Sequence, residues 1–297
     1  MRAWLWLLAL LLASPVAAAP GMWLVRDGDT EIALFGTVHA LPKGEAWMTP
    51  ALKARFDAAD TLVLETVIPD DPFALAPLLA EIGLRPGLKP LTERVSAAVR
   101  PRLAPAAATA GLPLAALDRM ETWLAAITLS EATLRSMGIV SDSGVEPALT
   151  ARARAAKKAI VGLETPEQQL RYLDSLPEAD QAAMLEATLD DLKVARADTE
   201  RLLGLWRAGD VETIAQEFAR EAKASPLLTK VLLTDRNARW ADWISGVMKR
   251  PGKVFLAVGA GHFGGPDGLL TLLKARGLTV ERVDAAAMVT PPVVTLP

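Results

Sequence analysis

Strand-forming segments lie towards both ends of this 297-residue chain, and a long helix-forming region separates them. Residues 22–26 and 31–37 are short apolar or alternating runs, and the turn signal Asp27-Gly28-Asp29 between them predicts a β-hairpin. Further apolar runs of strand length cover residues 61–67, 253–258 and 278–283. The simplest arrangement is one sheet to which both ends of the chain contribute.

The middle of the chain, residues 71–250, is rich in Ala, Leu, Glu and Arg at helical spacing. Prolines divide this region into separate helices. One interruption is predicted at residues 159–163, a short strand that ends at Glu164. The predicted fold class is α/β, a single domain over residues 19–284 with a mixed sheet built from strands at both chain ends and a large helical insertion between them.

Two shorter helices complete this prediction. Thr49-Pro50 is an N-cap followed by proline, which predicts a helix over residues 50–59. Residues 267–276 predict a helix between the last two strands, so that residues 253–283 read as a βαβ unit. Residues 285–297 show no periodicity and are predicted to form a loose tail.

The first residues are typical of a secretory signal peptide. Arg2 precedes an apolar run over residues 3–12, and small residues lead to Ala18. The apolar run is short against the roughly 20 residues that span a bilayer, so we expect cleavage after Ala18 instead of stable membrane insertion. The predicted location of residues 19–297 is the periplasm of a bacterium, or the medium outside it.

Composition excludes several classes of site. The chain has no cysteine, which excludes disulfides, thiolate ligands and a cysteine nucleophile. Its formal net charge of -3 provides no basic field for nucleic acid, so we expect a peptide or small-molecule substrate. Because the chain has no cysteine, any bound metal must use nitrogen and oxygen ligands.

The chain has two histidines, and both follow the pattern Gly-x-x-His at the end of an apolar strand. Chance alone would place glycine three residues before both His39 and His262 in about 1 of 200 such chains. Side chains at the carboxyl ends of strands in an open α/β sheet point into the crevice where these folds bind ligands. We therefore expect the two imidazoles to share one site.

Two imidazoles leave a metal ion incompletely coordinated, and two carboxylates are placed to complete it. Glu65 lies inside a predicted strand, and Glu164 ends another. A buried carboxylate needs a partner, which a zinc, iron, manganese or cobalt ion would provide. The alternative is that both are capped or salt-bridged carboxylates at strand ends.

A competing motif overlaps the second histidine. Residues 259–264 match G-x-G-x-x-G after a strand, and Asp284 follows at a distance that suits a dinucleotide site. Too few residues follow Asp284 for the remaining half of such a fold, and an exported protein meets little nicotinamide cofactor. The metal-site interpretation is therefore preferred.

At these residues the sequence resembles the TraB/GumN family, which is related to the Tiki-type proteins. The resemblance covers most of the chain after the signal and rests on residues 34–39, 62–65, 144–146, 161–165, 235–237 and 258–262. It implies an active centre of two Gly-x-x-His motifs and a glutamate and, for the Tiki branch, a metal-dependent protease that favours manganese or cobalt. Related folds include erythromycin esterase and haem-binding ChaN proteins. Glu146 departs from the family pattern, in which many members have Asp.

The expected function is that of an exported metal-dependent hydrolase acting on peptide or ester bonds. The candidate residues are, as metal ligands, His39, Glu65 and His262 and, as catalytic groups, Glu164, Arg236 and Asn237. Glu164 would complete the coordination shell or act as general base, and Arg236 would face the developing oxyanion. Two alternatives stay open: a haem- or metal-binding periplasmic protein without turnover, and a non-haem iron oxygenase.

Overall fold

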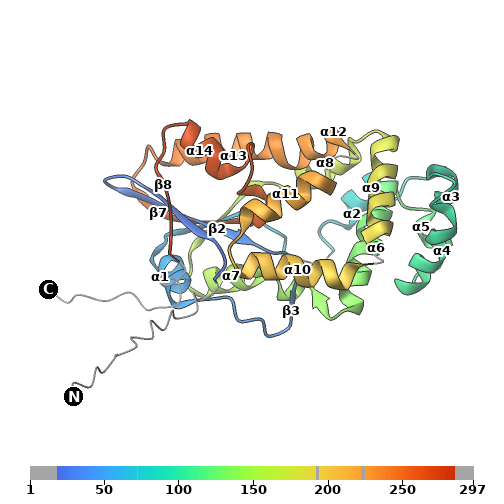
Figure 1. Cartoon of the computed structure of the whole chain (residues 1–297), viewed down its shortest axis with the longest axis horizontal. Helices are drawn as coiled ribbons and strands as arrows, with labels where there is room; N and C mark the ends of the chain where they lie inside the picture. Colours follow the sequence, from blue (N-terminus) through green and yellow to red (C-terminus); the bar gives the residue numbers. More distant parts are fainter. Residues whose placement is uncertain (1–18, 72, 192–193, 222–224, 285–297) are drawn as a thin grey trace, which may run out of the picture.

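A six-stranded mixed sheet forms the centre of the protein (Figure 1). We describe the protein from a computed structural model, and the description covers residues 19–71, 73–191, 194–221 and 225–284. The predicted signal peptide, residues 1–18, and the predicted tail, residues 285–297, lie outside these ranges. The strand order is β6-β4-β7-β2-β1-β8. The strands are β1 (Met22–Arg26), β2 (Thr30–Thr37), β4 (Thr61–Thr66), β6 (Ala159–Glu164), β7 (Gly252–Gly259) and β8 (Val280–Arg282).

Strands from the two ends of the chain share this sheet, as the sequence predicts. β7 lies between β4 and β2 and is parallel to both. β6 is parallel to β4, whereas β1 pairs antiparallel with β2 and with β8. The predicted hairpin and the predicted fold class are thus confirmed. Since β2, β4, β6 and β7 run in one direction, their carboxyl ends share one edge of the sheet.

Two details differ from the sequence prediction. β8 is parallel to β7 but lies beyond β2 and β1, so the connection through α14 crosses two strands instead of forming a neighbouring βαβ pair. The helical region also has a second interruption: β5 (Ile139–Val140) pairs with β3 (Leu41–Pro42) in a separate two-stranded sheet. Strands of two residues are too short to show periodicity, so the sequence pattern could not reveal them.

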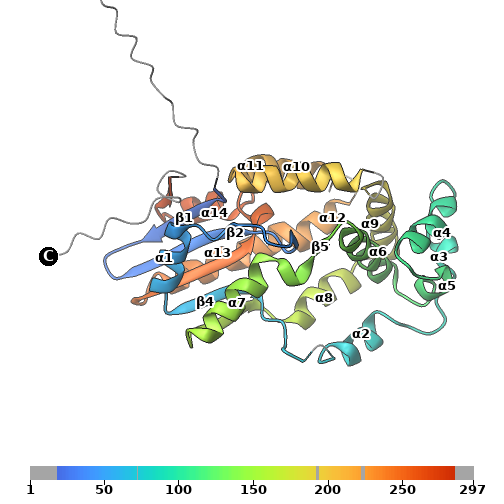
Figure 2. The same cartoon turned by 90° about the horizontal axis from the view of Figure 1, so that it is seen from below.

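Helices cover the sheet and extend beyond it, so that α3, α4 and α5 lie at the opposite end of the long axis from β7 and β8 (Figures 1 and 2). The α-helices are α1 (Pro50–Ala58), α2 (Ala76–Ile82), α3 (Leu91–Arg94), α4 (Arg100–Thr109), α5 (Leu114–Leu117), α6 (Thr122–Ser136), α7 (Val145–Ala155), α8 (Pro166–Asp174), α9 (Glu178–Asp191), α10 (Ala195–Arg207), α11 (Val211–Glu221), α12 (Pro226–Thr229), α13 (Asp235–Val247) and α14 (Leu269–Ala275). Single turns of other helix types are η1 (Ser141–Ser143), η3 (Lys230–Thr234) and η4 (Ala260–His262).

The protein has two apolar cores among the described residues, one around the sheet and one in the helical end. The larger core surrounds the sheet and includes the fully buried Phe35, Phe255 and Trp240. The smaller core lies among α3, α4, α5, α6 and α9. A buried hydrogen bond ties α10 to the sheet, because Trp206 Nε1 donates to the carbonyl oxygen of Gly36 at 2.8 Å. That carbonyl lies three residues before His39, so the bond fixes the strand end that carries the first histidine.

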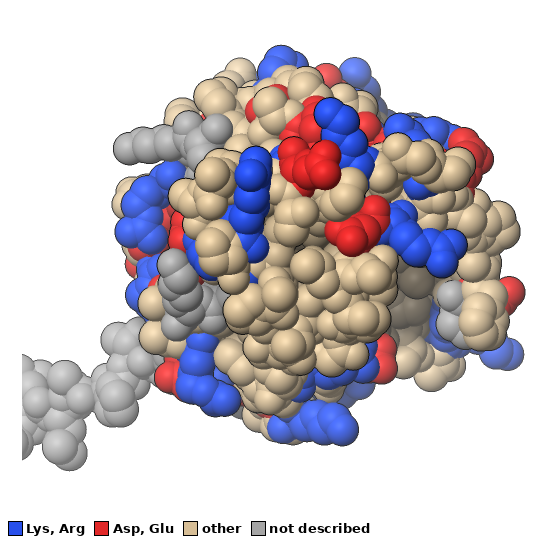
Figure 3. Space-filling model, turned by 90° about the vertical axis from the view of Figure 1, so that its right-hand side faces the viewer, with Lys and Arg blue, Asp and Glu red and all other residues tan. Residues whose placement is uncertain are grey.

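The surface of the helical end carries charges of both signs. Figure 3 views the molecule from this end, and its basic and acidic side chains are interspersed, without a continuous area of either sign. This distribution agrees with the small net charge of the chain. Among the described residues, no helix is long and apolar enough to cross a membrane.

The central position of β7 makes a direct prediction about folding. A chain that ends before Gly252 loses β7 and β8, which leaves β4 and β2 without the strand that joins them. We expect this truncated chain to show no cooperative thermal unfolding by circular dichroism. A chain that ends at Asp284 is the matched control and should melt like the full-length protein. A cooperative, native-like transition in the shorter chain would contradict the single-sheet architecture.

Candidate active site

Parallel pairing of β2 with β7 brings the two histidines together. Thr37 at the end of β2 pairs with Gly259 at the end of β7, so each histidine follows within three residues of the same sheet edge. The turns pack closely: a Cβ atom added to Gly36 would lie 3.3 Å from the Cα atom of Ala260. A larger residue at Gly36 would push the second turn back by a few tenths of an ångström, so glycine here favours the close approach of the two motifs.

Gly259 marks the point on which the histidines and Glu65 converge. A Cβ atom at this position would lie 3.2 Å from Glu65 Oε1, 3.6 Å from His39 Nε2 and 3.6 Å from His262 Cδ2. Gly259 has φ -50° and ψ 135°, which any residue adopts, so its backbone does not require glycine. Glycine here leaves space between the three side chains.

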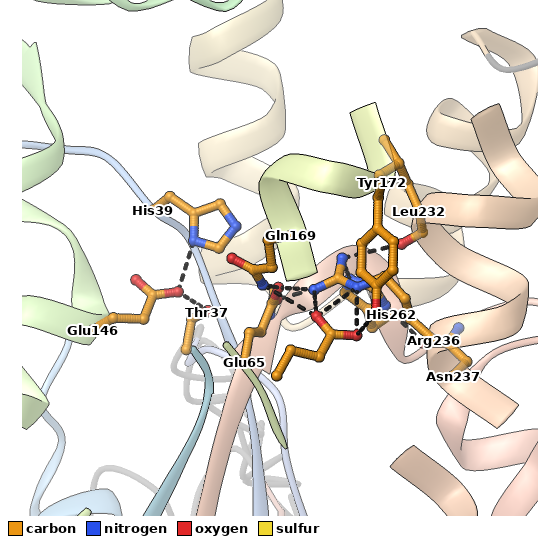
Figure 4. Close-up of polar contacts among 12 residues, drawn as sticks. Thr37, His39, Glu65, Glu146, Gln169, Tyr172, Leu232, Arg236, Asn237 and His262 are labelled. Carbon is orange, nitrogen blue, oxygen red and sulfur yellow. Dashed lines mark hydrogen bonds and ion pairs between the residues drawn. The ribbon is translucent and has the colours of Figure 1, made fainter. Parts of the chain in front are cut away.

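His39 is held from one side by Glu146. Its Nδ1 atom lies 2.8 Å from Glu146 Oε1, and the ring stands between Glu146 and the cluster around Glu65 (Figure 4). The side chain is 69% exposed. Loss of hydration by itself lowers the pKa of His39, but the hydrogen bond and negative charge of Glu146 outweigh it and raise the pKa to about 9. In the absence of a bound metal, this imidazole is cationic at neutral pH.

His262 has a different environment. Asn237 Nδ2 donates to the carbonyl oxygen of Asp267 at 2.8 Å, which directs Asn237 Oδ1 towards His262 Nδ1 at 2.6 Å. His262 Nδ1 therefore carries the proton, and Nε2 keeps its lone pair. Burial lowers the pKa of His262 to about 4, and although the negative charge of Glu65 opposes this shift, the positive charge of Arg236 reinforces it. The ring is neutral and packs against Trp240, with 4.5 Å between the ring centroids.

Arg236 lies between the two carboxylates predicted from the sequence. Its Nη2 atom is 2.5 Å from Glu65 Oε2 and 2.9 Å from Glu164 Oε2, and its Nε atom also donates to Glu164. The guanidinium carbon lies 4.5 Å from the ring centroid of Trp240, a cation–π contact. Burial alone would raise the pKa of Glu65, but neighbouring positive charge and the Gly259 N–H lower it to about 2. Both carboxylates are thus held by a permanent cation.

Two residues of α8 join this cluster although their sequence pattern does not indicate a site. Gln169 Nε2 lies 3.4 Å from Glu65 Oε2 and 3.3 Å from Glu164 Oε2, and Tyr172 lies 3.3 Å from Glu164 Oε1. The one sequence signal near them is the capping box at Thr165, which predicts that a helix begins directly after Glu164. Gln169 and Tyr172 lie on this helix and contact that carboxylate. Neither residue type is distinctive enough to be recognised without the fold.

The structure brings every predicted site residue into one cluster. His39, Glu65 and His262 surround Gly259, while Glu164 and Asn237 contact Arg236 and His262, respectively. Glu164 is an ion-pair partner of Arg236, which is the alternative that the sequence left open for this carboxylate, and Asn237 contacts His262 Nδ1. Glu146, whose role the resemblance left open, contacts His39 directly.

The dinucleotide interpretation finds no support in this geometry. A Cβ atom on Gly261 would lie 2.6 Å from the ring of Phe218, and one on Gly264 would lie 2.4 Å from the carbonyl oxygen of Val211. These glycines therefore allow α11 to pack against the turn and do not face an open phosphate site. The helix α14 begins only at Leu269, so no helix N-terminus follows the motif closely.

The donor atoms are of the types that bind a transition metal. Both histidines use Nδ1 to contact an oxygen atom, which is how ligating histidines are held by groups beyond the metal, and glycine leaves space beside Glu65 Oε1. Two buried carboxylates share one buried guanidinium, so a further positive charge would be stabilised there. Within the described ranges, however, no three His, Asp or Glu side chains are close enough to enclose an ion as they stand.

Comparisons with known proteins identify one family and several uncharacterised relatives. The sequence model of the TraB/PrgY/gumN family matches residues 21–282. The uncharacterised protein YbaP of Escherichia coli strain K12 is 23% identical over 257 residues, which cover 86% of this chain and 92% of YbaP. An uncharacterised protein of Treponema pallidum is 24% identical over 275 residues, covering 86% of this chain and 80% of the relative. No solved structure matches the chain.

The neutral state of His262 predicts how stability depends on pH. The unfolded chain takes up a proton at this histidine near pH 6.5, whereas the folded protein does so only near pH 4, so acid favours the unfolded state between these values. Between about pH 7 and pH 5, we expect the metal-free protein to lose about 2 kcal/mol more of its unfolding free energy than a His262→Gln variant. Urea unfolding at both pH values measures this difference. Equal losses in the two proteins would show that His262 is not held neutral.

Proposed function

The chain belongs to the TraB/PrgY/gumN family, and from this premise we propose that it is an exported hydrolase of peptide or ester bonds. Its active centre is the cluster of His39, Glu65, Arg236 and His262. The observation that carries this proposal is the space at Gly259, where atoms of both histidines and Glu65 lie within 3.6 Å of one point. Two imidazoles, one carboxylate and a buried guanidinium near such a space are groups that can catalyse hydrolysis of a carbonyl compound.

The proposed cofactor is a divalent transition metal, manganese or cobalt by resemblance. His39 Nε2, His262 Nε2 and Glu65 Oε1 would hold it. When bound, such an ion polarises a carbonyl group and makes a bound water acidic enough to attack it. Deprotonation of His39 must accompany binding, because only the neutral ring has a lone pair to offer.

Arg236 supplies the positive charge on the opposite side of Glu65. Its Nη2 atom already binds Glu65, and its Nη1 atom lies 3.3 Å from His262 Nε2. A guanidinium fixed at this position would stabilise the negative oxygen that develops during attack on a carbonyl group. Glu164 holds Arg236 in place, because the Nε atom of Arg236 donates to both carboxylate oxygens of Glu164.

Substrate would approach from the side of His39. This histidine is the exposed member of the centre, whereas the side chains of Glu65, Arg236 and His262 are 10% exposed or less. A substrate group would therefore meet His39 before the buried members of the centre.

Histidine substitutions test the shared centre. We expect His39→Ala and His262→Ala each to abolish most bound manganese or cobalt and most hydrolysis of a peptide or ester panel. The double variant should lose little more, since residues that act as a unit are not additive. Elemental analysis and activity assays measure both effects. Stoichiometric metal and unchanged activity in both single variants would contradict the proposal.

Glu65→Gln separates two roles of the carboxylate. Loss of metal together with activity indicates a ligand. Retained metal with turnover lowered by roughly 10²- to 10⁴-fold indicates a general base. A haem absorbance band in the purified protein would instead favour the haem-binding alternative, and oxygen-dependent turnover with iron would favour the oxygenase.

Gly259→Ala tests the space itself. The added methyl group would lie 3.2 Å from Glu65 Oε1 and 3.6 Å from His39 Nε2 without straining the backbone. We expect at least a roughly tenfold loss of cobalt affinity and of activity, with little change in melting temperature. Gly246→Ala is the matched control, because nothing lies within 4 Å of its added Cβ atom. Unchanged cobalt binding in Gly259→Ala would exclude this point as the metal position.

A further inference from the structure

The first turn of α7 is built against the turn that carries His39. A Cβ atom on Gly144 would lie 2.1 Å from the carbonyl oxygen of His39, although Gly144 has φ -64° and ψ 169°, an ordinary extended conformation. Only glycine therefore permits this approach. The Val145 N–H donates to the carbonyl oxygen of Val38 at 3.2 Å. The start of α7 thus contacts the carbonyl groups of both Val38 and His39.

Glu146 continues this contact with its side chain. Its Oε1 atom accepts a hydrogen bond from Thr37 Oγ1 at 2.5 Å and lies 2.8 Å from His39 Nδ1 (Figure 4). Thr37 is 1% exposed, so this hydrogen bond holds the carboxylate against the buried end of β2. The Oε2 atom of Glu146 is buried and has no hydrogen-bond partner within the described chain. The side chain as a whole is 19% exposed, and a carboxylate oxygen is a stronger hydrogen-bond acceptor than a neutral oxygen.

From these contacts we infer that Glu146 is the positioning residue of the centre. It holds the proton of His39 on Nδ1 and directs Nε2 towards Gly259 and Glu65. The inference rests on the proposed function, in which His39 Nε2 is the working atom. Since the His39 side chain is 69% exposed, packing alone does not restrict its rotation, and the hydrogen bond to Glu146 does.

The two histidines are therefore held by different acceptors. His262 contacts the neutral amide oxygen of Asn237, and its orientation is also restricted by burial against Trp240. His39 depends on a charged acceptor and has no such packing. Groups that hold a ligating histidine typically contribute about 10- to 100-fold to metal affinity or activity. We expect Glu146 to act at His39 alone.

Imidazole NMR tests this directly, because the chain has two histidines and a ¹⁵N-histidine-labelled sample gives two ring signal sets. Spectra of His39→Gln and His262→Gln assign them. At alkaline pH, where both rings are neutral, His39 should be in the Nδ1–H form in the wild type. In Glu146→Met, which keeps the volume and removes the acceptor, the Nε2–H form should dominate, as in the free histidine side chain. Glu146→Gln should give an intermediate population, since its amide oxygen still accepts.

Asn237→Ala is the matched control and should alter the signals of His262 but not those of His39. If Glu146→Met does not fold, the intermediate population in Glu146→Gln is decisive by itself. A wild-type His39 in the Nε2–H form, or an unchanged His39 population in the Glu146 variants, overturns the inference. These results hold whether or not the protein hydrolyses any substrate tested.

A cobalt titration then tests whether the orientation of His39 affects metal binding at the proposed centre. We expect Glu146→Met to weaken cobalt binding by about 10- to 100-fold and Glu146→Gln to restore part of the loss. A changed His39 tautomer without any change in cobalt affinity would leave the positioning role intact and contradict the proposed metal function. Unchanged His39 signals with lost cobalt binding would overturn the positioning role.

Discussion

The parallel pairing of β2 with β7 is the constraint on which the rest of this structure depends. The pairing runs over eight residue pairs, from Thr30 opposite Gly252 to Thr37 opposite Gly259. A slip by one residue would turn the side chains of β7 to the opposite face of the sheet and separate the two Gly-x-x-His turns. The buried apolar residues on both strands stabilise this register, so the core of the protein also aligns its candidate active centre.

The pairing of β4 with β7 and with β6 creates an electrostatic problem that α13 resolves. Strands β4 and β6 end beside the histidine turns and deliver Glu65 and Glu164 into a buried region. Two buried carboxylates without a partner would cost several kcal/mol each. Arg236 on α13 pairs with both, and Asn237, the next residue, orients His262. One helix thus neutralises the carboxylates and positions a histidine, which links the stability of the fold to the arrangement of the site.

Much of this arrangement follows from local patterns in the sequence. Alternating and apolar runs identified all strands of the large sheet, because a strand buried on a sheet has a pattern that extends over several residues. The repeated Gly-x-x-His motif identified both histidines, and a charged residue inside an apolar strand identified Glu65. The two-residue strands β3 and β5, and the α8 residues Gln169 and Tyr172, were not predicted, since neither has a repeating or unusual pattern.

By itself, the sequence determined the element types, the family and the residues that form the candidate centre, since these depend on short-range periodicity and on rare residue types. Only the tertiary structure decided which of those residues contact one another. Whether Glu164 faces the histidines or Arg236, and whether Glu146 holds His39, depends on contacts between residues far apart in the chain. Such contacts are set by the packing of α7 and α13 against the sheet edge, and no local pattern records the distance between two helices that fold onto the same edge.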